Sequence, residues 1–484
     1  MKKLEIIALF SIILGAFALR LYKFNAPIGD WHSWRQTDTS AVSRNFVKDG
    51  FDVLHPKFDD LSMGVSLKDN PQGYRFVEFP IYNTAQAALF KYLGGFTIEQ
   101  WGRLVTIFSS LASIVFIYLL VKKHVGKAAA LFAAFFFAAL PYNIYFGRVI
   151  LPDPSMVMAI LGGIYFFDLW VETAKLRIYS WKFILAVVFT ASSFLLKPFA
   201  LFFTLPMFYL AFNKFGITFF KKWQLWVFFI ISLFPLGFWQ VWMRQYSEGI
   251  PRNDWLLNGN NIRFKGSFFH WLFGQRIGKI ILGYFGLPIV ALGILRNITQ
   301  KEGWFSFSFL ASSLLFMSVV ATGNVQHDYY QILIIPTLSI FFGKGADMIL
   351  RNAGGIFNRY ISLTTLVIFV GFMLAFSWFE VRDFYNIQHP EIIQAGKTVD
   401  EAVPKDAKVL APYGGDTTLL YYTKRKGWPV FDRSLPRFIK EGAQYMVFVN
   451  PTEPELNFKN YFVVLSEGDK YIVYDLTKPL KPIK

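Results

Sequence analysis

Eleven long apolar runs are the feature that most constrains how this chain folds. A helix that crosses a bilayer needs roughly 20 mostly apolar residues. We place such spans near 5–23, 101–121, 128–146, 151–171, 181–196, 198–213, 223–243, 280–296, 304–322, 329–349 and 358–379. Charged residues make up only 17% of the chain, against about 25% in soluble domains. The sequence therefore predicts a polytopic α-helical membrane protein with about eleven spans and additional juxtamembrane helices.

The basic residues between the spans predict the orientation of the chain. If the apolar segment 79–94 is a juxtamembrane or re-entrant helix, the odd-numbered spans run outward and every basic loop is cytoplasmic. Those loops carry Lys122, Lys123, Lys127, Lys175, Arg177, Lys214, Lys221, Lys222, Arg296, Lys301, Arg351 and Arg359. We therefore expect the N-terminus on the cytoplasmic side of the cytoplasmic (inner) membrane and the C-terminal domain outside it. This placement explains the net charge of +17 without nucleic acid as a partner.

The first apolar run and the cysteine count narrow the class further. The run 6–21 follows two lysines and resembles a signal peptide in outline, but no small-residue cleavage site follows it, so we predict a retained first span. The chain has no cysteine. Disulfide bonds, thiolate metal sites and a cysteine nucleophile are therefore excluded.

The composition changes after about residue 380. Strand-like runs begin at 408, 444, 461 and 471, separated by proline, glycine and charged turns, and a helical stretch over 391–403 precedes them. About 100 residues suffice for a small domain. We predict a transmembrane domain over 1–379, whose first outer loop is 24–100 and carries juxtamembrane helices, and a soluble extracytoplasmic α/β domain over 380–484.

The stretch Asp30–Phe46, which follows the first span, is too polar to cross a bilayer and unusually rich in aromatic residues. Residues three or four apart lie on the same side of a helix. In a helical conformation this stretch would therefore present two indoles, a guanidinium and a carboxylate on one side, from Trp31, Trp34, Arg35 and Asp38. We expect Thr37 or Asp38 to cap a helix that runs through Phe46. An amphipathic helix on the membrane surface is an equally good interpretation of this stretch alone, because Trp and Arg favour that depth.

The predicted topology gathers the unusual polar residues on the outer side of the membrane. Polar groups near a bilayer are costly and tend to face a cavity, so this gathering indicates function. The four clusters are Asp30, His32, Arg35, Gln36, Asp38 and Arg44; Glu78 with Tyr82; Arg148 with Asp153; and Lys197 with His327 and Tyr330. The structural alternatives are a helix cap for Glu78, a loop ion pair for Arg148 and Asp153, and a snorkelling side chain for Lys197.

The order of these motifs resembles the integral-membrane glycosyltransferases of the C fold, in the superfamily of protein O-mannosyltransferases and aminoarabinose transferases (glycosyltransferase family 39-like). The resemblance covers nearly the whole chain. The matching pieces are the first loop ending at Arg44–Phe46, the step Glu78–Tyr82, the turn Arg148–Asp153, Lys197-Pro198, His327–Tyr330 and the small outer domain. Where aminoarabinose transferases carry Asp-Glu-x-Arg-Tyr, this chain has Trp-Arg-Gln-Thr-Asp-Thr over 34–39. The candidates for the catalytic acid are therefore Asp38, Asp30 and Glu78.

The resemblance implies transfer of a hexosyl or pentosyl group from a polyprenyl-phosphate-linked donor to an acceptor on the outer face of the membrane, usually with inversion. In this hypothesis Asp38 is the general base, Asp30 or Glu78 is its substitute, and Asp153 orients the acceptor or assists the ring cation. The donor phosphate would be bound by Arg35, Arg148, Lys197, His327 and Tyr330. Sugar or acceptor would be bound by His32, Trp34, Gln36 and Tyr82.

The same resemblance bounds the partners and cofactors. Membrane lipids, the lipid-linked donor and an unknown glycan, lipid or protein acceptor are the expected partners, and nucleic acid is not. No cofactor is firmly implied. The carboxylates and His32 could bind a divalent metal ion, although their spacing does not require one.

Two other classes of function compete with a transferase. A transporter or flippase predicts polar residues at mid-span depth in both halves of the bundle, whereas the spans here are apolar and the charges lie at one face. A polymerase or ligase that uses a lipid-diphosphate donor is a nearer alternative. The sequence does not separate monophosphate from diphosphate donors.

Overall fold

The computed structural model describes residues 2–297, 300–352 and 358–481. The chain forms two compact units. The helical unit comprises Met1–Phe24, Arg103–Gln240 and Asn253–Asp383, and the mixed unit comprises Asn25–Gly102, Val241–Arg252 and Phe384–Lys484. These units differ from the consecutive ranges 1–379 and 380–484 that the sequence suggested. The first outer loop belongs with the tail because its Leu61 lies in the hydrophobic core of the tail.

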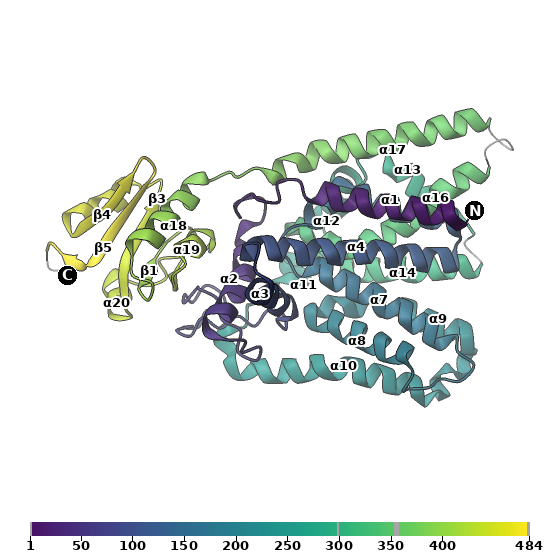
Figure 1. Ribbon diagram of the computed structural model, residues 1–484, viewed down its shortest axis with the longest axis horizontal. Helices are drawn as coiled ribbons and strands as arrows, with labels where there is room; N and C mark the ends of the chain where they lie inside the picture. Colours follow the sequence, from purple (N-terminus) through teal and green to yellow (C-terminus); the bar gives the residue numbers. More distant parts are fainter. Residues whose placement is uncertain (1, 298–299, 353–357, 482–484) are drawn as a thin grey trace. The chain divides into compact units, whose positions relative to one another are not determined.

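Helices build the helical unit, and the long ones have roughly parallel axes (Figure 1). They are α1 (Lys2–Arg20), α4 (Ile98–His124), α5 (Lys127–Ala139), α6 (Pro141–Phe146), α7 (Asp153–Val171), α8 (Trp181–Leu196), α9 (Leu205–Phe215), α10 (Trp223–Met243), α11 (Trp255–Asn258), α12 (Gly266–Phe269), α13 (Gly286–Leu295), α14 (Lys301–Val319), α15 (Ala321–Gln326), α16 (Ile335–Arg351) and α17 (Arg359–Val381). Short 3₁₀ helices extend several of them, at Pro198–Thr204, Gly216–Lys221 and Asp328–Ile334, and His270–Ile281 is a π-helix.

Seven helical segments of the described ranges are long and apolar enough to cross a membrane. They are Ile98–His124, Asp153–Val171, Pro198–Lys221, Trp223–Gly249, Lys301–Val319, Asp328–Arg351 and Arg359–Ala402. An eighth would be the pair Gly266–Ile281 and Gly286–Leu295, which is bent by 113°. The predicted helical fold with several apolar spans is confirmed, and the count of eleven stays a prediction. The helix at 79–94 is α3 (Ile81–Leu93), and its 13 residues are fewer than a full span requires.

Proline and glycine explain two local features of the helical unit. The predicted span 128–146 is broken into α5 and α6, because Pro141 lacks a backbone N–H and its ring clashes with the preceding turn. Helices α13 and α16 cross closely, since a Cβ added to Gly293 would lie 1.8 Å from the carbonyl oxygen of Phe341. Only glycine permits this crossing.

The mixed unit contains a five-stranded sheet with the order β2-β1-β3-β5-β4. Its strands are β1 (Lys408–Leu410), β2 (Gly427–Trp428), β3 (Ala443–Val449), β4 (Phe462–Gly468) and β5 (Tyr471–Pro479). Its helices are α2 (Ser33–Asp49), α3, α18 (Pro390–Ala402), α19 (Thr418–Thr423), α20 (Leu435–Lys440) and α21 (Glu453–Leu456). Strand β1 is parallel to β2 and β3, whereas β5 is antiparallel to β3 and β4. The small C-terminal sheet and the helix that precedes it are confirmed.

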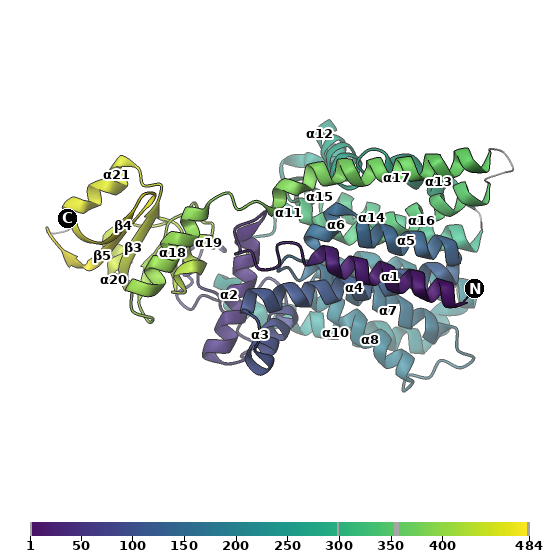
Figure 2. The same ribbon diagram turned by 45° about the horizontal axis from the view of Figure 1, so that its top comes forward.

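Both faces of this sheet are covered. Helices α18 and α19 lie beside the sheet (Figure 2) and pack Val399 and Leu420 against Val447 of β3. On the other face, Phe438 of α20 packs against Trp428. The first loop adds to the edge of the sheet, because the backbone N–H of Leu61 donates to the carbonyl oxygen of Gly427 at 2.8 Å. This pairing holds the loop between Asp38 and Arg75 at the edge of the sheet.

Candidate functional site

The polar stretch after the first span forms α2, and the predicted cap is wrong. The helix begins at Ser33 because His32 adopts the left-handed conformation (φ 56°) immediately before it. Asp38 therefore lies in the second turn of α2 and not at its N-terminus. Helix α2 contacts α3 and α19, and most of its buried side chains are polar, including Arg35 and Gln36. A buried polar face favours a functional site over a helix lying on the membrane surface.

The carboxylate of Asp38 is held from two directions. Nη2 of Arg75 lies 2.7 Å from its Oδ2, and the hydroxyl of Thr417 donates to its Oδ1 at 2.7 Å. Only 4% of Asp38 is exposed. Thr417 precedes α19, so the tail supplies one of the two partners. The sequence analysis missed Arg75 and Thr417, and neither carries a local signal, because they lie 37 and 379 residues from Asp38.

A second buried ion pair borders the same cavity as Asp38. Nη2 of Arg35 lies 2.6 Å from Oε1 of Glu78, and both side chains are buried. The other oxygen of Glu78, Oε2, accepts no hydrogen bond from the described residues. Arg35, Asp38, Arg75 and Glu78 line a cavity of about 20 Å³, which is enough for one water molecule. Two carboxylates and two guanidinium groups therefore share one small polar cavity.

A larger aromatic pocket lies at the start of α2. It has a volume of about 300 Å³, and its lining includes Asp30, Trp31, His32, Trp34, Tyr413 and Asp416. The amide nitrogen of Gln36 donates to Oδ1 of Asp30 at 2.7 Å. Burial raises the pKa of Asp416. Aromatic faces beside carboxylates are what a sugar ring requires, because its C–H groups stack and its hydroxyls donate.

The predicted site residue Tyr82 lies elsewhere in the mixed unit. Its side chain is buried and its hydroxyl donates to the carbonyl oxygen of Gly102 at 2.6 Å. It does not line either of these cavities. The structure therefore brings His32 and Trp34 to one pocket, joins Gln36 to that pocket through Asp30, and leaves Tyr82 outside both cavities.

Asp60, which the sequence analysis did not select, should make stability depend on pH. Burial raises the pKa of Asp60 to about 7 from an ordinary 3.8, and the nearby carboxylate of Asp38 adds to the rise. Because the folded state holds this proton more tightly, the contribution to stability is full below about pH 4 and is lost as the pH rises through 7. Each pH unit in that window is worth up to about 1.4 kcal/mol.

We expect Asp60→Asn to flatten this part of the stability profile. Thermal unfolding of the purified protein between pH 4 and 8 measures it, and the melting temperature of wild type should fall relative to the variant as the pH rises. Asparagine retains the oxygen that accepts from the backbone N–H of Ser62. Parallel profiles for the two proteins would show that Asp60 does not titrate in this range.

The helical unit carries the other predicted cluster. The ammonium of Lys197 lies 2.6 Å from Oδ1 of Asp153, and both side chains are at least nine-tenths buried. The aromatic rings of Tyr329 and Tyr330 face the same ammonium at 5.3 and 5.5 Å from their centroids. The second oxygen of Asp153 is buried and accepts no hydrogen bond from the described residues. The loop ion pair considered for Asp153 is thus made with Lys197 and not with Arg148.

His327 and Arg148 belong to the same helical unit. The ring of His327 stacks on Tyr330, with centroids 6.0 Å apart, and lies against Trp255. Arg148 is buried, and its Nη1 donates to the carbonyl oxygen of Lys23 at 3.3 Å. His327 and Tyr330 therefore belong with Lys197 in one aromatic and cationic cluster.

One part of the chain matches a known protein family. Residues 80–242, about a third of the chain, match the family described as dolichyl-phosphate-mannose-protein mannosyltransferase. This match confirms the predicted resemblance. The matched segment includes Arg148, Asp153 and Lys197. No curated protein sequence matches the chain.

Solved structures show that the similarity of fold extends beyond the matched segment. ArnT from Cupriavidus metallidurans bound to undecaprenyl phosphate is 12% identical, with a TM-score of 0.63 and 97% of each chain covered. The archaeal oligosaccharyltransferase AglB from Archaeoglobus fulgidus, in complex with an inhibitory peptide and a dolichol-phosphate, is 11% identical, with a TM-score of 0.58. That alignment covers 93% of this chain and 69% of AglB. The chain therefore has the fold of these membrane proteins.

Within the described ranges, no group of three or more histidine or acidic side chains is arranged to hold a metal ion. The carboxylates of the site are instead paired with arginine, lysine and threonine side chains. What the arrangement offers chemically is proton transfer and the binding of an anion.

Proposed function

We propose that this protein is a membrane glycosyltransferase that moves a sugar from a polyprenyl-phosphate-linked donor to an acceptor at the outer face of the cytoplasmic membrane. The observation that carries the proposal is the buried Asp38, oriented by Arg75 and Thr417 beside a polar cavity, in a chain with the ArnT fold. The lipid phosphates bound in the ArnT and AglB structures support a donor of this class. The transferred sugar is a hexosyl or pentosyl group.

In this proposal the mixed unit supplies the base and the sugar or acceptor site. Asp38 takes the proton of the acceptor hydroxyl as the sugar C–O bond to phosphate breaks. Arg75 and Thr417 hold the carboxylate in one orientation, which lowers the cost of reaching the reactive geometry. Glu78 lines the same cavity, and one of its oxygens accepts no hydrogen bond from the described residues. It is the substitute base. The aromatic pocket with Trp34 and His32 binds a sugar ring. Asp30 accepts a hydrogen bond there from a sugar hydroxyl.

The helical unit supplies the phosphate ligands in this proposal. Departure of the lipid phosphate builds negative charge that a buried ammonium stabilises strongly. Lys197 is assigned this role, with His327 and Tyr330 donating hydrogen bonds and Arg148 adding positive charge. Asp153 holds Lys197 until the donor arrives, and its second oxygen orients the acceptor. The tail after residue 380 is assigned to the outer side, and the basic loops to the cytoplasmic side.

The donor class is tested by incubating membranes that contain the protein with radiolabelled donors. We expect transfer of label from a polyprenyl-monophosphate sugar and none from the corresponding nucleotide sugar, because the proposed site faces away from the cytoplasm. Membranes without the protein are the control. Transfer from the nucleotide sugar alone would contradict the proposal, and transfer from a lipid-diphosphate sugar alone would redefine the donor.

A further inference from the structure

A second large cavity of the mixed unit shares no residue with those assigned to transfer. It has a volume of about 290 Å³ and lies between the end of α2, the loop at Asp59 and the tail. Six cations and two carboxylates line it, namely Arg44, Lys48, Lys405, Lys424, Arg425 and Lys426 with Asp59 and Asp400. Such a gathering of like charges repels itself and needs an explanation.

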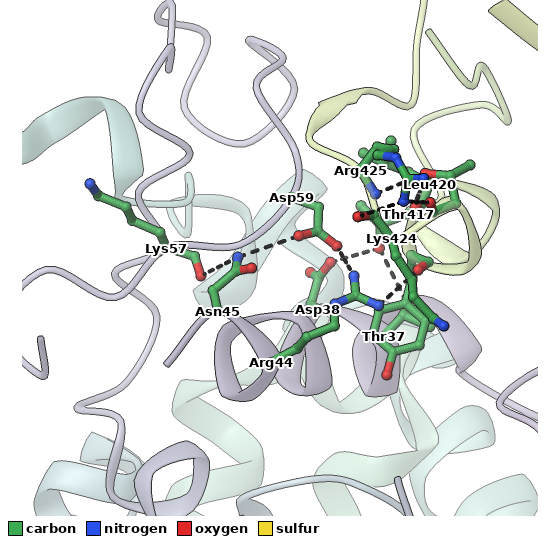
Figure 3. Close-up of polar contacts among 12 residues, drawn as sticks. Thr37, Asp38, Arg44, Asn45, Lys57, Asp59, Thr417, Leu420, Lys424 and Arg425 are labelled. Atoms are coloured by element: carbon green, nitrogen blue, oxygen red, sulfur yellow. Dashed lines mark hydrogen bonds and ion pairs between the residues drawn. The ribbon is translucent and has the colours of Figure 1, made fainter. Parts of the chain in front are cut away.

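Two of these cations are already neutralised. Arg44 bonds the carboxylate of Asp59 (Figure 3). It also donates to the carbonyl oxygen of Tyr421 at 3.0 Å. Arg425 is 2% exposed, and its guanidinium bonds Oδ1 of Asp400 at 2.9 Å and several backbone carbonyl oxygens. These two pairs line the cavity and contribute no net charge.

The four lysines remain, and little compensates them. Lys405 and Lys424 approach Asp400 at 2.6 and 2.8 Å, although Arg425 already balances that carboxylate. Among the described residues, Lys426 forms an ion pair only with the half-exposed Asp49, at 3.5 Å. Lys48 is exposed, and no ion pair to it is found among the described residues. With Asp49 counted, six cations face three carboxylates, which leaves three positive charges around one hollow.

We propose that this cavity binds a phosphate group carried by a glycan or by a lipid headgroup. A phosphate monoester carries about −1.5 to −2 charges and three acceptor oxygens, which matches several mobile ammonium groups better than a single carboxylate does. The lysine stems come from α2 and from the tail, so the ligand would join two parts of the mixed unit. This inference does not depend on the proposed transfer reaction.

Direct binding tests it. Inorganic phosphate is titrated by calorimetry into the full-length protein in neutral detergent, without any donor, so failure of transfer and failure of binding are distinguishable. We expect saturable binding that weakens at least tenfold in Lys48→Glu/Lys426→Glu. The matched control is Lys459→Glu/Lys478→Glu, which reverses two charges on exposed tail residues outside the cavity.

The result that would overturn the proposal is equal binding by wild type and Lys48→Glu/Lys426→Glu, no binding by wild type, or an equal loss in the control variant. Because all four lysines reach solvent, the variants should fold, and matched melting temperatures confirm it. Glucose 6-phosphate and short-chain dihexanoyl phosphatidic acid are then titrated. Binding of the first identifies a glycan phosphate and binding of the second a headgroup phosphate, and absence of both would overturn the proposal.

Discussion

Replacing Asp38 by asparagine should lower the rate of sugar transfer by about 10² to 10⁴-fold, the usual contribution of a positioned general base. Asparagine is nearly the same size and retains the oxygen that accepts from Thr417, but it cannot take a proton. Initial rates of transfer from a labelled polyprenyl-phosphate sugar, measured with wild type and variant at equal amounts of folded protein, give the ratio. Thr417→Val, which keeps the carboxylate but removes one hydrogen bond, should cost much less.

The matched comparison is Glu78→Gln, because Glu78 lines the same cavity and pairs with Arg35. We expect a smaller loss than for Asp38→Asn. If Glu78→Gln is inactive while Asp38→Asn keeps most of its rate, the base is Glu78 and the role assigned to Asp38 is wrong. Asp30→Asn provides the same comparison for the third candidate acid.

Removing one partner of the Lys197–Asp153 pair should have the largest effect on stability. Asp153→Ala leaves a buried ammonium without its carboxylate, and breaking a buried pair in this way costs about 3–5 kcal/mol. Thermal unfolding in detergent should show a drop of several degrees. The variant Lys197→Met/Asp153→Leu should recover most of that stability, because two apolar side chains of similar volume leave no buried charge.

The same variants separate stability from donor binding. Lys197→Met/Asp153→Leu should be stable but bind the polyprenyl-phosphate donor about 10 to 100-fold more weakly, since a hydrogen bond to a charged group is worth about 1.5–3 kcal/mol. Lys197→Arg keeps the charge, and its donor affinity should lie between those of wild type and the double variant. Unchanged donor affinity in the stable double variant would remove Lys197 from the phosphate site.

The sequence was sufficient for features that are encoded locally. The strands of the tail and the helix before them follow from alternation and from the proline, glycine and charged turns between them. The break at Pro141 was equally local, and the length of the apolar run obscured it. Helix α2 begins at Ser33, about one turn before the predicted caps Thr37 and Asp38. The left-handed backbone of His32, which precedes it, has no signature in the sequence.

The parts of the site that sequence analysis missed are pairings between distant segments. Thr417 reaches Asp38 only because the first loop extends the edge of the tail sheet at Gly427. The two-residue strand β2 that receives this loop is too short to show periodicity. Lys197 and Asp153 were each selected from the sequence for their position at a tight turn, whereas their mutual contact required the fold.

The most direct test of the central claim is a reconstitution of the purified protein in liposomes with a polyprenyl-phosphate sugar labelled in the sugar. The proposed function predicts that free polyprenyl phosphate accumulates in step with loss of the labelled lipid once a crude extract of cell-envelope acceptors is added. Asp38→Asn should show neither change. If wild type moves the intact labelled lipid between leaflets without ever releasing polyprenyl phosphate, the protein is a flippase and not a transferase.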